Sequence, residues 1–568
     1  MQPCFMDEKY LNVAKTFINE ELDFKWSEME RQILKKVFTN LKGRVFFIRN
    51  VLPANMIAVL LAIYSRLRNR RGLRGVFVDN FLPNLLSVNL PECLDRYQGD
   101  PAAFLKGEKI TSLARFLEFS DLAKEVTQKF LDNLGDSGYW DSLSQAQKMK
   151  GFLSTWLDRY GHNSIARPAA LYLCCENISI LAAKSLEWSR PGAGYIELST
   201  RYVDMAGKDV YPIAKELAAY GVPEEEVNAV IEESFKQYRT LQGENFSGVL
   251  PTFFREQFKE QMTPEQLEAG AIGETCDVLG NFLPAATLTS VGIGLSGETL
   301  PETIRHLLLD GTPENFAIVE MIKTEAAKIG ADQFLRHLEP TPWQTSTWSY
   351  LKNEKITSTM DLPVLGSVEE VLLKAFQNKE YFKNCLTWND IKNELGKLPR
   401  GNFDKLPREF ELINASFYSQ MSFRSWRDLQ RMGFSTHRRS YLNPDNGLYR
   451  YDKPAPDELE TAVAILENCN KKLYELMTKA NVPEELKQYP LALGNMINFL
   501  ISSNLRQWEF CNWQRSKPSV NHEVRQVFLT AENILRESLP WWNDLSRANI
   551  TPAYIFARGD SDLPLKLN

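Results

Sequence analysis

The sequence predicts an α/β protein, more narrowly α+β, made of two duplicated units behind an N-terminal helical extension. Each unit is expected to be a mixed sheet flanked by helices. The chain has 568 residues, more than one hydrophobic core organises, so two or three domains are expected. Runs with apolar residues at three- and four-residue spacing alternate with short runs rich in β-branched and aromatic residues. These runs occur twice in the same order.

The N-terminal extension covers residues 1–43. Its two segments, 7–22 and 26–41, have the apolar spacing of amphipathic helices. The next run, RVFFI, predicts a first strand and opens the first unit, 44–340.

The centre of the first unit combines a strand and a capped helix. Residues 166–179 are rich in aromatic, β-branched and Cys residues without a helical stripe, which favours a strand. Ser179 is expected to cap the following helix, and Pro191 and Gly192 to end it before a loop. Further helices are expected at 222–240, 263–281, 301–309 and 312–329.

A Pro-, Thr-, Ser- and Trp-rich connector, 341–368, predicts a linker before the second unit, 369–568. In that unit Ser422 is expected to cap a helix after a strand. The other elements expected there are a strand at 411–420, a turn at 444–447, and helices at 456–480, 483–487 and 521–535.

Matching spacings support the duplication. Nine residues separate Arg190 from Ser199, and nine separate Arg431 from Ser440. Each half then has an apolar run containing proline, FLPAATLTS or YPLALGNMI, before a helix.

Composition excludes several classes of protein. The net charge of −6 and pI of about 5.7 give no basic field for a nucleic-acid partner. The basic run 66–74 fits either a solvated helix end or a local phosphate site. The sequence shows no 18-residue apolar run, no signal-peptide pattern and no paired C-x-x-C, which predicts a reduced, cytoplasmic protein without a membrane segment. The scattered histidines and the missing P-loop pattern predict neither a metal site nor a P-loop NTPase.

Residues 197–202, ELSTRY, are the main candidate for a binding wall. A hydroxyl, a guanidinium and a phenol on an extended segment can converge on a phosphate or a pyrimidine edge. The alternative is a surface β-edge with a Glu–Arg pair. For His162, in RYGHNS, the alternative to a site is a side chain that interacts with a helix dipole.

Two other patterns have structural alternatives. Gly292-x-Gly294-x-x-Gly297 matches a dinucleotide fingerprint, but close backbone packing explains it better. The segment 504–526 carries Arg506, Arg515, His522 and Arg525 between tryptophans, which fits an anion pocket with stacking rings or a solvated helix.

Together these elements give a family resemblance. GHNS, a strand, a helix ending near arginine and then Y-x-E-L-S-x-R-Y resemble the flavin-dependent thymidylate synthases. The likeness covers most of 44–330 and again about 400–535. It implies reductive methylation of dUMP to dTMP, with FAD as cofactor and NADPH and methylenetetrahydrofolate as co-substrates. It also implies active sites shared between subunits.

The resemblance assigns roles position by position. It implies nucleotide binding by Ser199, Arg201, Tyr202 and Arg506, with Ser199 and Arg201 nearest the chemistry. It implies cofactor binding by His162, Arg190, Glu197, Arg431, Arg515 and His522.

The family's R-H-R motif is lost, because Ser189-Arg190-Pro191 and Arg431-Met432-Gly433 stand in its place. Glu298 occupies the first unit's N-x-R arginine position, and the second unit has His437-Arg438-Arg439-Ser440 instead of E-L-S-x-R-Y. We therefore expect one composite site, in which the first unit's serine wall faces Arg431, Arg506 and Arg515. The alternatives are a flavoenzyme acting on another pyrimidine nucleotide and a non-catalytic nucleotide-binding or scaffold protein. Fused copies suggest a homodimer or other homo-oligomer.

Overall fold

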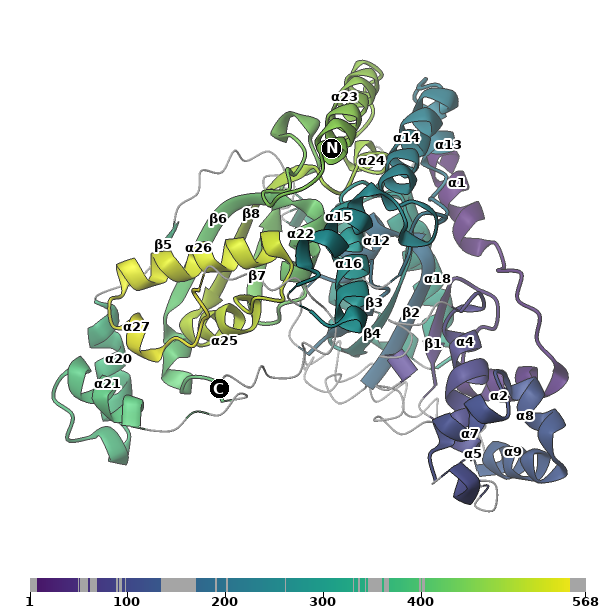
Figure 1. Ribbon diagram of the computed structural model, residues 1–568, viewed down its shortest axis with the longest axis horizontal. Coiled ribbons are helices and arrows are strands. Elements are labelled where there is room, and N and C mark those ends of the chain that lie inside the picture. The colour runs from purple at the N-terminus through teal and green to yellow at the C-terminus, as the bar shows by residue number, and fades with distance from the viewer. Residues whose placement is uncertain are drawn as a thin grey trace.

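The computed structural model shows two sheets, each with its own helices (Figure 1). It describes residues 8–49, 51, 60–61, 69–87, 90, 94–97, 99–133, 170–188, 192–200, 203–260, 262–329, 331–335, 338–342, 344–345, 360–361, 367–397, 400 and 404–551. In the part of the chain described, no helix is long and apolar enough to cross a membrane.

The N-terminal extension is helical, as predicted. Helices α1 (Glu8–Asn19) and α2 (Glu28–Val37) lie within the two predicted segments. Ser27 and Glu30 form a reciprocal capping box at α2, which satisfies two backbone N–H groups that the helix itself leaves unpaired. A second apolar core packs α2 against a group of helices that follow the first strand: α4 (Gly72–Gly75), α5 (Leu82–Ser87), α7 (Pro101–Gly107), α8 (Leu113–Phe119) and α9 (Asp121–Asn133).

Of the basic run 66–74, the structure describes residues 69–74, which lie beside this core. Arg74 is fully buried against Glu176, and Arg71 pairs with Glu30 and Asp79. These two arginines hold the N-terminal layer to the first sheet, so they are structural rather than part of a phosphate site.

The first sheet has the strand order β1-β2-β4-β3. Every pairing in it is antiparallel, so the expectation of a mixed sheet is wrong, although the α/β class is confirmed. Its strands are β1 (Val45–Ile48), β2 (Ala170–Ser179), β3 (Gly194–Glu197) and β4 (Leu288–Ser296). The segment after Gly192, predicted as a loop, pairs with β4 as the edge strand β3.

Helices cover this sheet. Those predicted at 222–240, 263–281, 301–309 and 312–329 are present, whereas the helices at 213–218 and 249–258 were not predicted. Ser179 caps α12 (Ile180–Leu186) by accepting from Ala182 N, as predicted. Gly292 and Gly294 lie inside β4 rather than in a loop; a Cβ on Gly292 would lie 2.6 Å from Leu61, which confirms close packing. The other helices are α13 (Ile213–Ala218), α14 (Glu224–Gln242), α15 (Val249–Phe258), α16 (Pro264–Leu279), α17 (Thr299–Asp310) and α18 (Pro313–Ala327).

The second sheet repeats the order as β5-β6-β8-β7 and is also antiparallel throughout. Its strands are β5 (Met360–Asp361), β6 (Asn414–Ser422), β7 (Ser435–Arg439) and β8 (Met496–Asn504). Ser422 caps α22 (Phe423–Gln430), as predicted. The remaining helices are α20 (Val368–Gln377), α21 (Trp388–Lys397), α23 (Asp457–Lys479), α24 (Glu484–Lys487), α25 (Leu505–Arg515), α26 (His522–Ser538) and α27 (Trp542–Leu545).

The two halves share one hydrophobic core and join through the apolar proline-containing runs. Pro284 and Ala492 form an antiparallel bridge, and Leu493 N donates to Leu283 O at 2.8 Å. Helices α14 and α23 also pack side by side and project together (Figure 1). The second half thereby supplies side chains to the edge of the first sheet.

Strand register corrects one predicted match. Leu198 N donates to Ser290 O after β3, and Ser440 N donates to Asn498 O after β7. Ser440 therefore occupies the place of Leu198 rather than of Ser199. The linker boundary stays a prediction, since within 341–368 the structure describes only 341–342, 344–345, 360–361 and 367–368.

Candidate functional site

A small pocket lies where the end of β3 meets α22 of the other half. We call it the arginine pocket. It is lined by Glu197, Leu198, Ser199, Thr200, Arg424, Arg427, Asp428 and Arg431. Residues 197–200 belong to the predicted binding wall. The other four residues come from α22 and from Arg431, the residue that directly follows this helix. Arg424, Arg427 and Arg431 are spaced by three and four residues, so they lie on one face of α22.

Glu197 is the centre of the buried charge network. Its Oε1 accepts from Arg427 at 2.8 Å, and its Oε2 accepts from Lys184 Nζ at 2.7 Å. Burial alone would raise its pKa, but Arg427, Lys184 and Arg431 together lower the pKa of Glu197 to about 2. Glu197 is therefore a carboxylate that joins a cation of each half.

Glu187 forms the inner edge of the network. Lys184 Nζ contacts its Oε2, and its Oε1 is buried without a hydrogen-bond partner. Burial raises the pKa of Glu187, and the neighbouring Glu197 charge adds to this. Beside Glu197, which is held ionised, Glu187 is the carboxyl of the pair that protonates more readily.

The remaining two arginines differ in how firmly they are held. Arg424 is buried against Asp277 of α16. Arg431 pairs with Asp428 at 3.0 Å within one turn of the chain, and its side chain keeps 32% exposure. A partly exposed pair three residues apart contributes about 1 kcal/mol or less. The Arg431 charge also interacts with Glu187 and Glu197 deeper in the pocket, but Asp428 is the carboxylate that a ligand anion can most readily replace.

The arginine pocket as it stands does not fit a flavin. Lys184 and the three arginines each have a carboxylate partner. The cavity measures about 50 Å³, room for one or two waters, whereas small-molecule pockets enclose about 300–1,000 Å³. A nucleotide therefore requires the pocket to open, and in its closed form the pocket supports no chemical step through FAD.

Four of the predicted site residues, His162, Arg190, Arg201 and Tyr202, lie outside the described residues. Of the rest, the structure brings Glu197, Ser199 and Arg431 together in the arginine pocket.

Arg506 is held elsewhere. Its Nε donates to Leu406 O at 2.6 Å, and its NH1 group pairs with Glu411 at 2.8 Å. It binds the short helix 408–412 near the end of β8, so the expected arrangement in which Arg506 faces the serine wall is not formed.

His522 and Arg515 also lie outside the pocket lining. His522 Nδ1 is 2.7 Å from Asp452 Oδ1, and burial lowers the pKa of His522. The next residue, Glu523, bonds to Ser422, so this end of α26 lies at the start of α22 rather than at its pocket end. Arg515 is the last residue of α25.

Sequence reasoning missed most of the charge network: Lys184, Glu187, Asp277, Arg424, Arg427 and Asp428. The spacing of the three α22 arginines was a readable signal, because it predicts one cationic helix face. The carboxylates gave no such signal, since Asp277 and Glu197 reach α22 only through the joining of the two halves.

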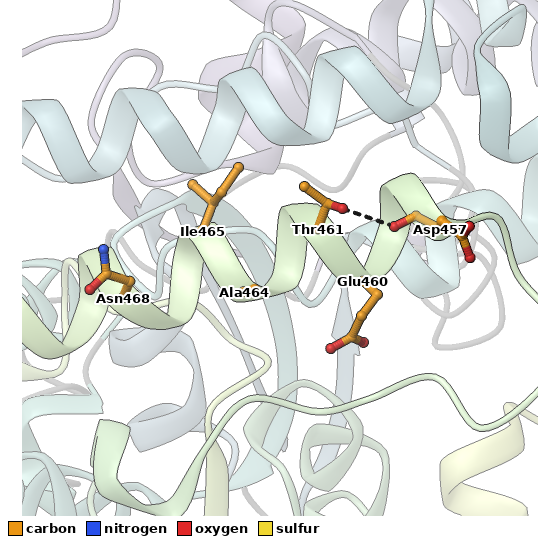
Figure 2. A pocket seen from close by; sticks show the side chains of 6 residues that line it. All are labelled: Asp457, Glu460, Thr461, Ala464, Ile465 and Asn468. Atoms are coloured by element: carbon orange, nitrogen blue, oxygen red, sulfur yellow. Dashed lines mark hydrogen bonds between the residues drawn. The ribbon is translucent and has the colours of Figure 1, made fainter.

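A larger hollow lies along α23 (Figure 2). It is a shallow surface hollow of about 640 Å³, open to solvent and lined by Asp457, Glu460, Thr461, Ala464, Ile465 and Asn468. Its only charged lining groups are acidic, so it repels a nucleotide phosphate and is a poor candidate for the predicted substrate.

Three related sequences align with most of this chain at low identity. A UPF0159 protein from Chlamydia pneumoniae is 23% identical over 549 residues, covering 89% of this chain and 91% of the relative. The UPF0159 protein of Chlamydia muridarum is 23% identical over 552 residues, covering 90% and 92%. The UPF0159 protein Ta1429 of Thermoplasma acidophilum is 21% identical and covers 67% of this chain and 85% of the relative.

Solved structures are similar at low identity. The UMP/dUMP methylase PolB from Streptomyces cacaoi, bound with 5-Br UMP, aligns at 13% identity and a TM-score of 0.26, over 35% of this chain and 99% of that chain. Residues 116–308 match the family described as thymidylate synthase complementing protein. That segment contains β2, α12, β3 and β4, so the resemblance to the flavin-dependent thymidylate synthases, predicted from the same stretch, is confirmed there.

Proposed function

We propose that the protein is a thymidylate synthase-like enzyme that methylates dUMP to dTMP. One observation carries this proposal. The segment that matches the family supplies one wall of the arginine pocket, and the other wall is a row of arginines. Anionic nucleotides are commonly bound by guanidinium groups, which match phosphate geometry.

Two described residues are proposed to hold the nucleotide. Arg431 exchanges its Asp428 partner for the phosphate, because this pair is the most exposed in the pocket. Ser199 adds a hydroxyl donor from the facing wall. Glu197 and Arg427 stay paired and fix the distance between the walls. Arg201 and Tyr202 complete the proposed substrate contacts.

FAD, with NADPH and methylenetetrahydrofolate as co-substrates, belongs to this proposal through the family. If bound, FAD would supply the electrons for reduction of the one-carbon unit. His162, Arg190, Arg515 and His522 remain the proposed cofactor residues.

A non-catalytic nucleotide-binding or scaffold protein is the second candidate. It is favoured by the charge balance of the arginine pocket, in which every lining arginine already has a carboxylate. The eroded R-H-R positions favour the same candidate. A flavoenzyme acting on another pyrimidine nucleotide is the related alternative within the enzymes.

Rescue of a thymidine-requiring strain tests the leading proposal. Expression of the wild-type chain is expected to restore growth without thymidine, and the purified protein is expected to show flavin absorbance after incubation with FAD. Ser199→Ala should weaken rescue at equal protein level. A protein that stays colourless with FAD and does not rescue growth, yet binds dUMP, would establish the scaffold function instead.

We further propose that the two halves are duplicated units, 44–340 and 369–568, in a cytoplasmic homodimer or other homo-oligomer. Support comes from the common strand order and from a shared helix cap, in which Ser179 bonds to Glu314 and Ser422 bonds to Glu523. Light scattering and sedimentation would test the assembly.

A further inference from the structure

An exposed aromatic residue lies next to the arginine pocket. Phe434 is on the turn between α22 and β7, three residues after Arg431, and keeps 70% exposure. Three residues of chain span about 11 Å at most, so Phe434 lies within that reach of the pocket's exchangeable arginine.

The backbone of Phe434 is strained. Its φ is +62°, a conformation in which a bulky side chain meets the neighbouring backbone. The turn before β3 in the first half has Gly192 at φ +83°, which adopts this region without such strain. A glycine would thus suit the second turn better, yet that turn carries a large apolar ring in water.

The neighbouring strand β8 anchors the turn, so the strained conformation is held in place. Ser503 Oγ donates to Phe434 O at 3.1 Å, and Ser435 pairs with Ser503 in the strand register. Behind it His437 is buried beside Met432 O, and burial lowers the pKa of His437 to about 4, so the imidazole is neutral at pH 7. The surrounding structure imposes the geometry on Phe434. Strain that is retained in this way tends to mark a functional position.

We propose that Phe434 is a substrate-positioning residue, whose ring stacks on the base of the nucleotide that Arg431 holds by its phosphate. This inference rests on the proposed function. The face of the Phe434 ring can stack on any planar base, and the Arg431 guanidinium selects for the negative charge of the phosphate. The two residues would thus recognise the two ends of a mononucleotide. The first half has no such pair, since Gly192 stands at the equivalent turn.

Stability and affinity should therefore change in opposite directions at this residue. Phe434→Gly removes both the ring and the strain. Binding of dUMP is expected to weaken about tenfold, in line with the loss of one base–aromatic stack, while the urea midpoint stays equal to that of the wild type or rises. Phe434→Tyr should bind as the wild type does, and Phe434→Leu should lose affinity without gaining stability.

A probe without a base separates stacking from other effects. Deoxyribose 5-phosphate should compete equally well for the wild type and Phe434→Gly, because it uses only the arginine. Asn481→Gly is the matched control: Asn481 has φ +54° in the turn after α23, and dUMP affinity should not change there.

The outcomes distinguish this inference from the function. If the wild type binds dUMP and Phe434→Gly binds it equally well, the stacking role is overturned and the proposed function stands. It is also overturned if Phe434→Gly weakens deoxyribose 5-phosphate as much as dUMP. If the wild type binds neither dUMP nor UMP, the proposed function fails, and the inference fails with it.

Discussion

In each half the helix after the capping serine and the following edge strand form a corner, and the two corners share a strand order but differ in charge. Lys184 and Arg427 occupy the same place relative to the capping serines, and Glu187 corresponds to Gln430. Glu197, paired with Val291 in the sheet, corresponds to Arg439, paired with Phe499. At the last two of these three positions, the first corner has two carboxylates, whereas the second has a neutral amide and an arginine.

This difference explains why, among the described residues, the arginine pocket forms at the first corner and not at the second. Glu197 attracts Arg427 across the boundary between the halves. Arg439 instead lies over the rings of Phe423 and Trp426, and donates to Gln488. Two corners with the same strand order therefore differ through the charges at a few equivalent positions.

The largest expected effect comes from removing the shared carboxylate. Glu197→Gln leaves Lys184 and Arg427 with less compensation in a buried setting, and should lower the free energy of unfolding by about 3–5 kcal/mol. Urea unfolding measures it. Arg439→Gln, the change at the equivalent place in the other corner, should cost less, because Arg439 bonds to neutral groups.

A double variant checks the cause of that loss. Adding Arg427→Met to Glu197→Gln removes the buried cation that has lost its carboxylate, whereas Lys184 still pairs with Glu187. The double variant should therefore recover part of the lost stability. If Arg439→Gln lowers the free energy of unfolding as much as Glu197→Gln does, the buried charges of the two corners contribute equally to stability, and the proposed difference between them is wrong.

The second effect is a pH dependence from two buried carboxyl groups at the first half's boundary. Glu216 and Glu314 are buried beside Tyr211 and Tyr489. Burial raises the pKa of Glu216 to about 8 and of Glu314 to about 7. The folded state therefore binds protons that the unfolded chain has released. The contribution of these groups is fully present below about pH 4.5, and is lost as pH rises to about 8.

Glu216→Gln should remove part of this slope. The free energy of unfolding of the wild type should fall by up to about 1.4 kcal/mol per pH unit more steeply than that of the variant across this window. Denaturation series from about pH 5 to 8.5 compare the two. Parallel curves would show that Glu216 stays ionised in the folded protein.

The helix caps at Ser179 and Ser422 are a feature in which the two halves remain alike, so substitutions there test the similarity. Each capping serine bonds to a carboxylate of a later helix, Ser179 to Glu314 and Ser422 to Glu523. Ser179→Ala and Ser422→Ala should each cost about 1–2 kcal/mol, since each removes a helix cap and a carboxylate partner. Similar losses at the two sites would support the duplication, and a clear inequality would count against it.

Local signals predicted the elements well, and the site only in part. Ser179 and Ser422 act within a few residues, so the starts of the helices that follow them were predicted correctly. The sheets were predicted as mixed because pairing direction depends on contacts far apart in the chain. The matching of Ser440 with Ser199 was one residue off, because counting in sequence ignores hydrogen-bond register. Arg506 looked free to bind a phosphate, but Glu411, distant in sequence, pairs with it.

The smallest expected change in stability makes the sharpest distinction between the corners. Asp428→Asn removes the partner of Arg431, the one pocket pair that is partly exposed, and should change the free energy of unfolding by about 1 kcal/mol or less. If a nucleotide phosphate replaces Asp428 at Arg431, the variant should bind dUMP several-fold more tightly, because the competing carboxylate is gone. Titration calorimetry with dUMP measures this. The control is Asp277→Asn, which uncovers Arg424 deep against α16 and should lower stability by several times as much without tightening binding. Equal affinity in Asp428→Asn and the wild type would mean that the phosphate does not meet Arg431, and that the arginine pocket holds the two halves together without binding the substrate.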